Sequence, residues 1–153
     1  VHVHAHDMLY TYTLCEPTRR RLCGCALCLT GPVAAKTLHD ASEAQLEATE
    51  RELLVHASLT HPGVVTLHGA SLSPPGCCIV MELCETSLFE RLHAHPYELG
   101  RRKVVQLAAQ VAEAMAFLHS RSPPLVHRDL KSHNVLLAEG ETQARLCDFG
   151  LVN

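Results

Sequence analysis

The chain has 153 residues, with 13 lysines and arginines against 16 aspartates and glutamates, so its formal net charge is −3. A chain with this balance lacks the basic stripe that is typical of proteins that bind nucleic acid or anionic membranes. No apolar run is long enough to span a bilayer, and no signal-peptide pattern opens the chain. We therefore expect a cytoplasmic protein with no membrane segment and no nucleic-acid partner.

The eight cysteines are better explained as small buried hydrophobic residues than as a disulfide framework, because disulfides are rare in cytosolic proteins. Two clusters offer an alternative metal site: Cys23, Cys25 and Cys28 with Cys15 upstream, and His2, His4 and His6. No second Cys-x-x-Cys or histidine pair follows at zinc-finger spacing, so the sequence favours packing over metal binding.

The first half of the chain predicts strands around one helix. Residues 1–14 alternate loosely and indicate one or two strands, and Val33–Lys36 indicates another. Residues 40–60 predict a helix that Asp40 or Ser42 can cap. The apolar stripe expected on this helix consists of Leu46, Leu53 and Leu54.

Two further strands are predicted at residues 64–67 and 77–81, because both runs are rich in β-branched or apolar side chains. Ser73-Pro74-Pro75-Gly76 between them is a strong turn signal. A short helix begins at residue 87 and is closed by Pro96.

Residues 101–120 predict the clearest helix of the chain. Its expected apolar face recurs at helical spacing and consists of Val104, Ala108, Val111, Met115 and Leu118. Ser122-Pro123-Pro124 ends the helix, and two strands at 135–137 and 144–147 flank a turn at 139–141.

A carboxylate, an ammonium, a carboxamide and a second carboxylate gather after this helix. His127-Arg128-Asp129 comes first, Lys131 and Asn134 follow, and Asp148-Phe149-Gly150 comes last. In this order and spacing they resemble the motifs of protein kinases, and His-Arg-Asp-Leu-Lys-Ser-x-Asn is most similar to the tyrosine-kinase-like serine/threonine group. The resemblance implies an α+β, protein kinase-like bilobal fold that uses ATP and Mg²⁺ to phosphorylate Ser or Thr hydroxyls of protein substrates.

The resemblance also implies roles for these residues. Asp129 would accept the hydroxyl hydrogen of the substrate, and Lys131 would offset charge on the transferred phosphate. Asn134 and Asp148 would provide oxygen ligands for the metal.

In the first half of the chain, Lys36 would contact the α and β phosphates, and Glu52 would pair with it. Glu43, Glu47 and Glu50 are competing partners for the lysine. The nucleotide base would lie against a set of residues from several strands: Ala34, the gatekeeper Met81, the hinge residues Glu82 and Cys84, and Leu136.

The same resemblance divides the chain into three parts. Residues 33–85 would form the small β-rich lobe with the family's C helix, up to the hinge, and residues 86–153 the first part of a mainly helical large lobe, cut just after Asp-Phe-Gly. Residues 1–32 would be a degenerate or incomplete start, because Gly24 and Gly31 do not form the expected glycine-rich loop. The alternative function is therefore a pseudokinase-like module that binds nucleotide or protein without phosphotransfer.

Overall fold

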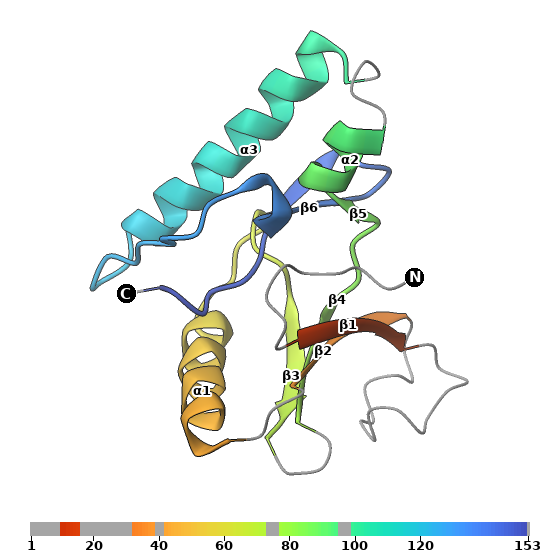
Figure 1. Ribbon diagram of the computed structural model, residues 1–153. Helices are drawn as coiled ribbons and strands as arrows, with labels where there is room; N and C mark the ends of the chain where they lie inside the picture. Colours follow the sequence, from red (N-terminus) through yellow and green to blue (C-terminus); the bar gives the residue numbers. More distant parts are fainter. Residues whose placement is uncertain (1–9, 16–31, 39–41, 73–76, 95–98, 153) are drawn as a thin grey trace. The chain divides into compact units, whose positions relative to one another are not determined.

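The computed structural model describes residues 10–15, 32–38, 42–72, 77–94 and 99–152 (Figure 1). The chain divides into two compact units: Val1–Ala57 with Thr66–Leu83, and Ser58–Val65 with Cys84–Asn153. The expected glycine loop, the cysteine and histidine clusters and the turn at 73–76 fall outside the residues whose side chains are described. Within the described part of the chain, no helix is both long and apolar enough to cross a membrane.

The first unit is built on an antiparallel sheet with strand order β1-β2-β4-β3. The strands in that order are β1 (Tyr10–Cys15), β2 (Val33–Leu38), β4 (Cys78–Glu82) and β3 (Leu67–Ser71). The central strands provide the core, because Val33, Ala35 and the whole run from Cys78 to Met81 are buried. The predicted α+β class is confirmed.

The strand predicted at residues 64–67 is wrong in its first half. β3 begins only at Leu67, whereas Val64 and Val65 belong to the second unit. There Val64 forms a bridge with Leu146, and the Val65 N–H donates to the Leu146 carbonyl at 2.9 Å. An apolar run predicts an extended backbone but does not say which sheet it joins.

Helix α1 (Glu43–Ala57) confirms the helix predicted in this region, but its buried face is not the expected leucine stripe. The buried residues are Thr49, Glu52 and His56, and Leu54 is 67% exposed. Thr49 satisfies its hydroxyl by donating to the Gln45 carbonyl at 2.8 Å. The inward face of α1 is therefore set by polar side chains that have partners, and not by leucine content.

The second unit contains a three-stranded antiparallel sheet with strand order β5-β6-β7. Its strands are β5 (Thr86–Ser87), β6 (Val135–Ala138) and β7 (Gln143–Leu146). Its helices are α2 (Leu88–Ala94), α3 (Arg101–His119) and the short 3-10 turn η2 (Ser132–Asn134). Figure 1 shows η2 immediately before β6.

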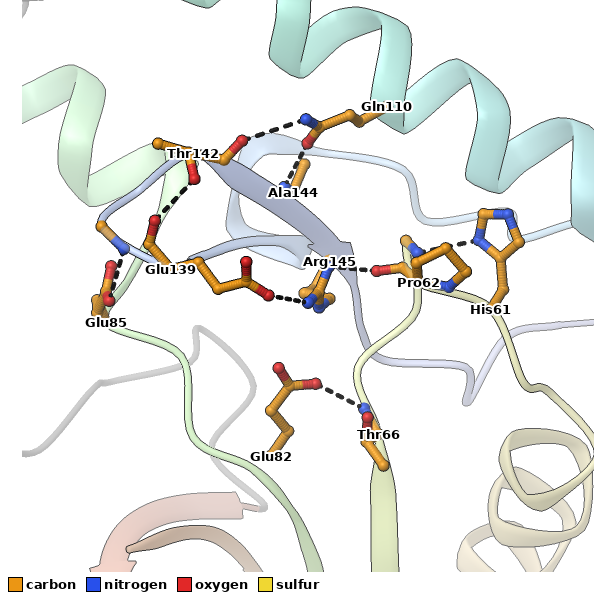
Figure 2. Close-up of polar contacts among 12 residues, drawn as sticks. His61, Pro62, Thr66, Glu82, Glu85, Gln110, Glu139, Thr142, Ala144 and Arg145 are labelled. Atoms are coloured by element: carbon orange, nitrogen blue, oxygen red, sulfur yellow. Dashed lines mark hydrogen bonds and ion pairs between the residues drawn. The ribbon is translucent and has the colours of Figure 1, made fainter.

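The helix expected at 101–120 is confirmed as α3, but its predicted apolar face is only partly buried. Leu118 is buried as predicted, and Val111 and Met115 are half-buried. The buried side chains are Leu107, Ala114 and Leu118, whereas Val104 is 48% exposed. Gln110 lies on the side of α3 that faces β7. Its side-chain amide accepts the Ala144 N–H at 2.7 Å and donates to the Thr142 carbonyl at 3.1 Å (Figure 2).

The turn between β6 and β7 uses a left-handed backbone at three successive residues. Glu139, Gly140 and Glu141 have φ angles of 53°, 67° and 59°. Left-handed conformations strain residues other than glycine. The Glu85 carboxylate offsets this strain by accepting the N–H groups of Gly140 and Glu141 at 3.0 and 2.9 Å (Figure 2).

The loop before Val64 packs tightly on α3. The His61 ring stacks on Phe117 with centroids 4.7 Å apart, and the His61 Nδ1 accepts the Gly63 N–H at 3.0 Å. Arg145 extends from β7 to the Pro62 carbonyl. A Cβ atom on Gly63 would lie 2.7 Å from the Ala114 Cβ, so this contact requires glycine.

We expect Gly63→Ala to lower the free energy of unfolding by about 1–3 kcal/mol, because the new methyl group overpacks the contact with Ala114. Gly100→Ala is the matched control, because a Cβ at Gly100 meets nothing within 4 Å. Urea denaturation of both variants measures the difference. Equal stability of the two variants would show that the loop can move away from α3 without cost.

Candidate active site

The ion pair expected between Lys36 and Glu52 is present in the first unit. The Lys36 Nζ lies 2.8 Å from Glu52 Oε1, and the side chains are 3% and 6% exposed. The competing glutamates Glu43, Glu47 and Glu50 are exposed on α1. Buried charges require partners because desolvation is costly. The pair therefore explains why α1 turns a glutamate inward.

The residues expected around the nucleotide base are divided between the units. Ala34 and Met81 are register partners on β2 and β4, and Met81 is buried. Glu82 at the end of β4 donates its N–H to the Thr66 carbonyl at 2.8 Å, and its carboxylate accepts the Thr66 N–H at 3.1 Å. Cys84 and Leu136 are half-buried residues of the second unit. Their roles at a nucleotide stay predictions.

Asp129, Lys131 and Asn134 meet in the second unit. The Lys131 Nζ lies 2.7 Å from Asp129 Oδ2. The Asn134 amide donates to both the Asp129 carbonyl and its Oδ2, at 2.9 and 2.8 Å. One carboxylate oxygen is thus held by an ammonium and a carboxamide together. Asn134 is itself only 6% exposed, so protein atoms and not solvent surround it.

Three contacts join the His127–Asn134 segment to the one that carries Asp148. His127 is fully buried, and its Nε2 donates to the Cys147 carbonyl at 3.1 Å. The Cys147 N–H donates to the Asn134 carbonyl at 3.1 Å. The His127 ring also contacts Phe149 with centroids 5.4 Å apart. The residue before Asp148 is therefore tied to both ends of the His127–Asn134 segment.

Backbone strain marks the same two motifs. Arg128 and Asp148 have φ angles of 62° and 66°, the left-handed region that residues other than glycine rarely adopt. Such strain persists only where surrounding contacts enforce it, and it gathers at functional sites. One strained residue lies directly before Asp129 and the other is Asp148 itself, and the remaining strained non-glycine residues in the described part of the chain, Glu139 and Glu141, lie in the β6–β7 turn.

Asn134 and Asp148 supply the hard oxygen atoms that Mg²⁺ prefers, and Mg²⁺ is commonly held by one or two carboxylates together with substrate phosphates. The chemistry of these two side chains fits that ion, and they would hold it as the sequence predicts. Across the described residues, no group of three His, Cys, Asp or Glu side chains forms a protein-only metal site.

The Lys131 hydrogen bond holds the pKa of Asp129 below its ordinary value of 3.8, with burial opposing the shift and Asn134 reinforcing it. Asp129 therefore stays ionised at neutral pH, as an acceptor of a substrate proton requires. Because the folded pKa is lowered, the stabilising contribution of this group is complete above the unfolded pKa and is lost as the pH falls through the folded value.

Sequence reasoning did not identify two supporting groups. Glu85 stabilises the β6–β7 turn from 55 positions away, and the Cys147 carbonyl orients His127. No periodicity or motif signals either contact, because one joins distant segments and the other uses a backbone atom. The structure shows Lys36 with Glu52 in one unit, and Asp129 with Lys131 and Asn134 in the other.

We expect Lys36→Met to lower the free energy of unfolding by about 3–5 kcal/mol, because it leaves the Glu52 carboxylate buried without its cation. A Lys36→Met/Glu52→Leu double variant should recover most of this loss, since both charges are then gone. Arg91→Met is a control: it breaks the more exposed pair with Glu141, which is worth about 1 kcal/mol or less. If the double variant were as unstable as Lys36→Met alone, the need to pair the buried Lys36 charge would not explain why Glu52 faces inward.

Lys131→Met should raise the pKa of Asp129 towards 3.8, because it removes the largest cause of the lowered value. Titration of the Asp129 carboxyl carbon by NMR measures the change. Lys103→Met should leave Asp129 unaffected, because Lys103 contacts Glu141 instead at 3.4 Å. An unchanged Asp129 titration in Lys131→Met would exclude this ion pair in solution.

Comparison with known proteins agrees with the motif pattern. The family model for protein tyrosine and serine/threonine kinases matches residues 29–153. The chain is 42% identical to the serine/threonine-protein kinase CTR1 of Arabidopsis thaliana over 104 residues. This alignment covers 66% of this chain and 12% of CTR1. It is 38% identical to mitogen-activated protein kinase kinase kinase 10 of Mus musculus over 117 residues. That alignment covers 69% of this chain and 12% of the mouse protein.

A third relative is the probable serine/threonine-protein kinase drkA of Dictyostelium discoideum, 35% identical over 122 residues, with 78% of this chain and 19% of that protein covered. The chain thus spans less than a fifth of the length of each of these three relatives. The family match extends from β2 through the Asp148-Phe149-Gly150 motif. The chain therefore belongs to the protein tyrosine and serine/threonine kinase family.

Proposed function

We propose that this domain transfers the γ-phosphate of ATP, bound with Mg²⁺, to serine or threonine hydroxyls of protein substrates. The observation that carries the proposal is the Asp129 carboxylate, which is kept ionised and is oriented by both Lys131 and Asn134. Phosphoryl transfer has a loose transition state, so an oriented acceptor for the hydroxyl proton contributes more than a strong base.

Each residue has a role that follows from its chemistry. Asp129 accepts the proton of the attacking hydroxyl, and Lys131 stabilises negative charge on the phosphoryl group while it holds Asp129. Asn134 and Asp148 would hold a magnesium ion, which would supply positive charge to neutralise the phosphates. Lys36 binds the phosphates, and its pairing with Glu52 keeps its ammonium group in one position.

Serine and threonine specificity is supported by two observations. Lys131 lies two residues after Asp129, in a motif most similar to the tyrosine-kinase-like serine/threonine group. Two of the similar proteins, CTR1 and drkA, are 42% and 35% identical to this chain and are named as a serine/threonine-protein kinase and a probable one.

The purified protein, mixed with Mg²⁺, γ-labelled ATP and a library of peptides that contain Ser, Thr and Tyr, should give labelled phosphoserine or phosphothreonine. Asp129→Asn should lower the rate by about 100-fold or more, the usual contribution of a positioned proton acceptor. Glu113→Gln, an exposed position on α3, is the control and should not change the rate.

Nucleotide binding without any labelled product would overturn the proposal and support a pseudokinase-like binding module. Labelled phosphotyrosine alone would overturn only the choice of hydroxyl. Product formation that persists in Asp129→Asn would show that another group accepts the proton.

A further inference from the structure

The phenyl ring of Phe89 lies between two imidazole rings in the second unit. The His93 ring, one turn further along α2, has its centroid 3.9 Å from that of Phe89 with 33° between the planes. The His133 ring, from η2, lies 3.7 Å away at 20° and is stacked. Aromatic rings in contact attract each other beyond the area that they bury. The three rings therefore connect α2 to the segment that carries Asp129 and Asn134.

The Phe89 side of this stack is held rigidly by the start of α2. Ser87 and Glu90 form a reciprocal cap, in which the Glu90 N–H donates to the Ser87 hydroxyl and the Ser87 N–H donates to the Glu90 carboxylate, both at 3.1 Å. The His93 Nδ1 donates to the Phe89 carbonyl at 2.8 Å, which fixes the second imidazole. Phe89 is thus a preorganised surface for His133.

The His133 side of the stack lies next to the candidate active site. Asn134 follows His133 directly, and its amide donates to Asp129 Oδ2 at 2.8 Å. The turn that contains both residues is a single 3-10 turn, whose Asn134 N–H donates to the Lys131 carbonyl at 2.9 Å. A turn this short has few hydrogen bonds of its own, so side-chain contacts contribute strongly to its position.

We propose that His133 and Phe89 are positioning residues, whose ring contact fixes η2 so that the Asn134 amide orients the Asp129 carboxylate. The effect of this contact on rate rests on the proposed phosphotransfer, whereas its effect on Asn134 does not. Neither ring bonds Asp129, so both act through Asn134. Without the stack, η2 would occupy several positions and only a fraction of molecules would hold Asp129 in the reactive orientation.

The inference predicts that a flat ring, and not side-chain volume, is required at position 133. His133→Ala and His133→Leu should each lower kcat by about fivefold, the rate equivalent of one aromatic contact. His133→Phe should retain the activity, because it can still stack on Phe89. Phe89→Leu should reproduce the loss from the other side of the stack. His119→Ala, an exposed histidine at the end of α3, is the matched control.

The Asn134 side-chain amide resonances, followed by NMR, provide a readout that needs no activity. They should move towards the values of a solvated amide in His133→Ala, His133→Leu and Phe89→Leu, and should stay in place in His133→Phe and His119→Ala. Thermal melting identifies any variant that has unfolded, and the remaining variants then decide the question.

Two results would overturn the proposal. If the Asn134 resonances do not move in folded His133→Ala, the stack does not position the amide, whatever the activity. If His133→Leu keeps the same kcat and the same Asn134 resonances as His133→Phe, position 133 requires only a side chain of sufficient volume. The contact with Phe89 would then be ordinary packing. If the wild-type protein transfers no phosphate while the resonances respond as expected, the proposed function fails and the positioning role stands.

Discussion

Burying the charges of Lys36 and Glu52 is the constraint on which the first unit depends. Removing either charge from water is costly, so the two side chains must meet, and they do so at 2.8 Å. Lys36 lies in the centre of the sheet, on β2 opposite Ile79 of β4, and Glu52 lies at the middle of α1. The pair thereby determines which face of α1 turns inward, at the expense of Leu54, which stays in solvent.

The second unit follows the same rule with hydrogen bonds. The Asp129 carboxylate is bonded by the Asn134 amide, and the His127 ring bonds the Cys147 carbonyl. The N–H groups of the strained β6–β7 turn are bonded by the Glu85 carboxylate. Strain at Arg128 and Asp148 is tolerated because these partners enforce the backbone around them. These contacts hold the Asp129 carboxylate in one orientation, and preorganised polar groups of this kind need little rearrangement when charge develops next to them.

Local signals allowed much of the site to be predicted from the sequence. Asp129, Lys131 and Asn134 are close in the chain, so a motif could select them together. The helix at 101–120 was evident from the helical spacing of its apolar residues. The inward Glu52 of α1 was predicted from its pairing with Lys36, but the apolar stripes of α1 and α3 were only partly right, because Leu54 and Val104 are exposed. Gln110 turns inward on α3 to bond the start of β7, and no apolar pattern signals this. Val64 and Val65 were assigned to the wrong sheet, and the contact of Phe89 with His133 joins segments that no pattern connects.

The assignment of Ser58–Val65 to the second unit has a topological consequence. The polypeptide passes from one unit to the other three times, after Ala57, after Val65 and after Leu83, so the two lobes are interleaved along the gene. No single cut yields both lobes intact. A piece ending at Leu83 would carry Val64 and Val65 without Leu146, exposing two valines that are now buried and inviting aggregation. Separating the two units without dividing either one therefore requires three cuts in the chain.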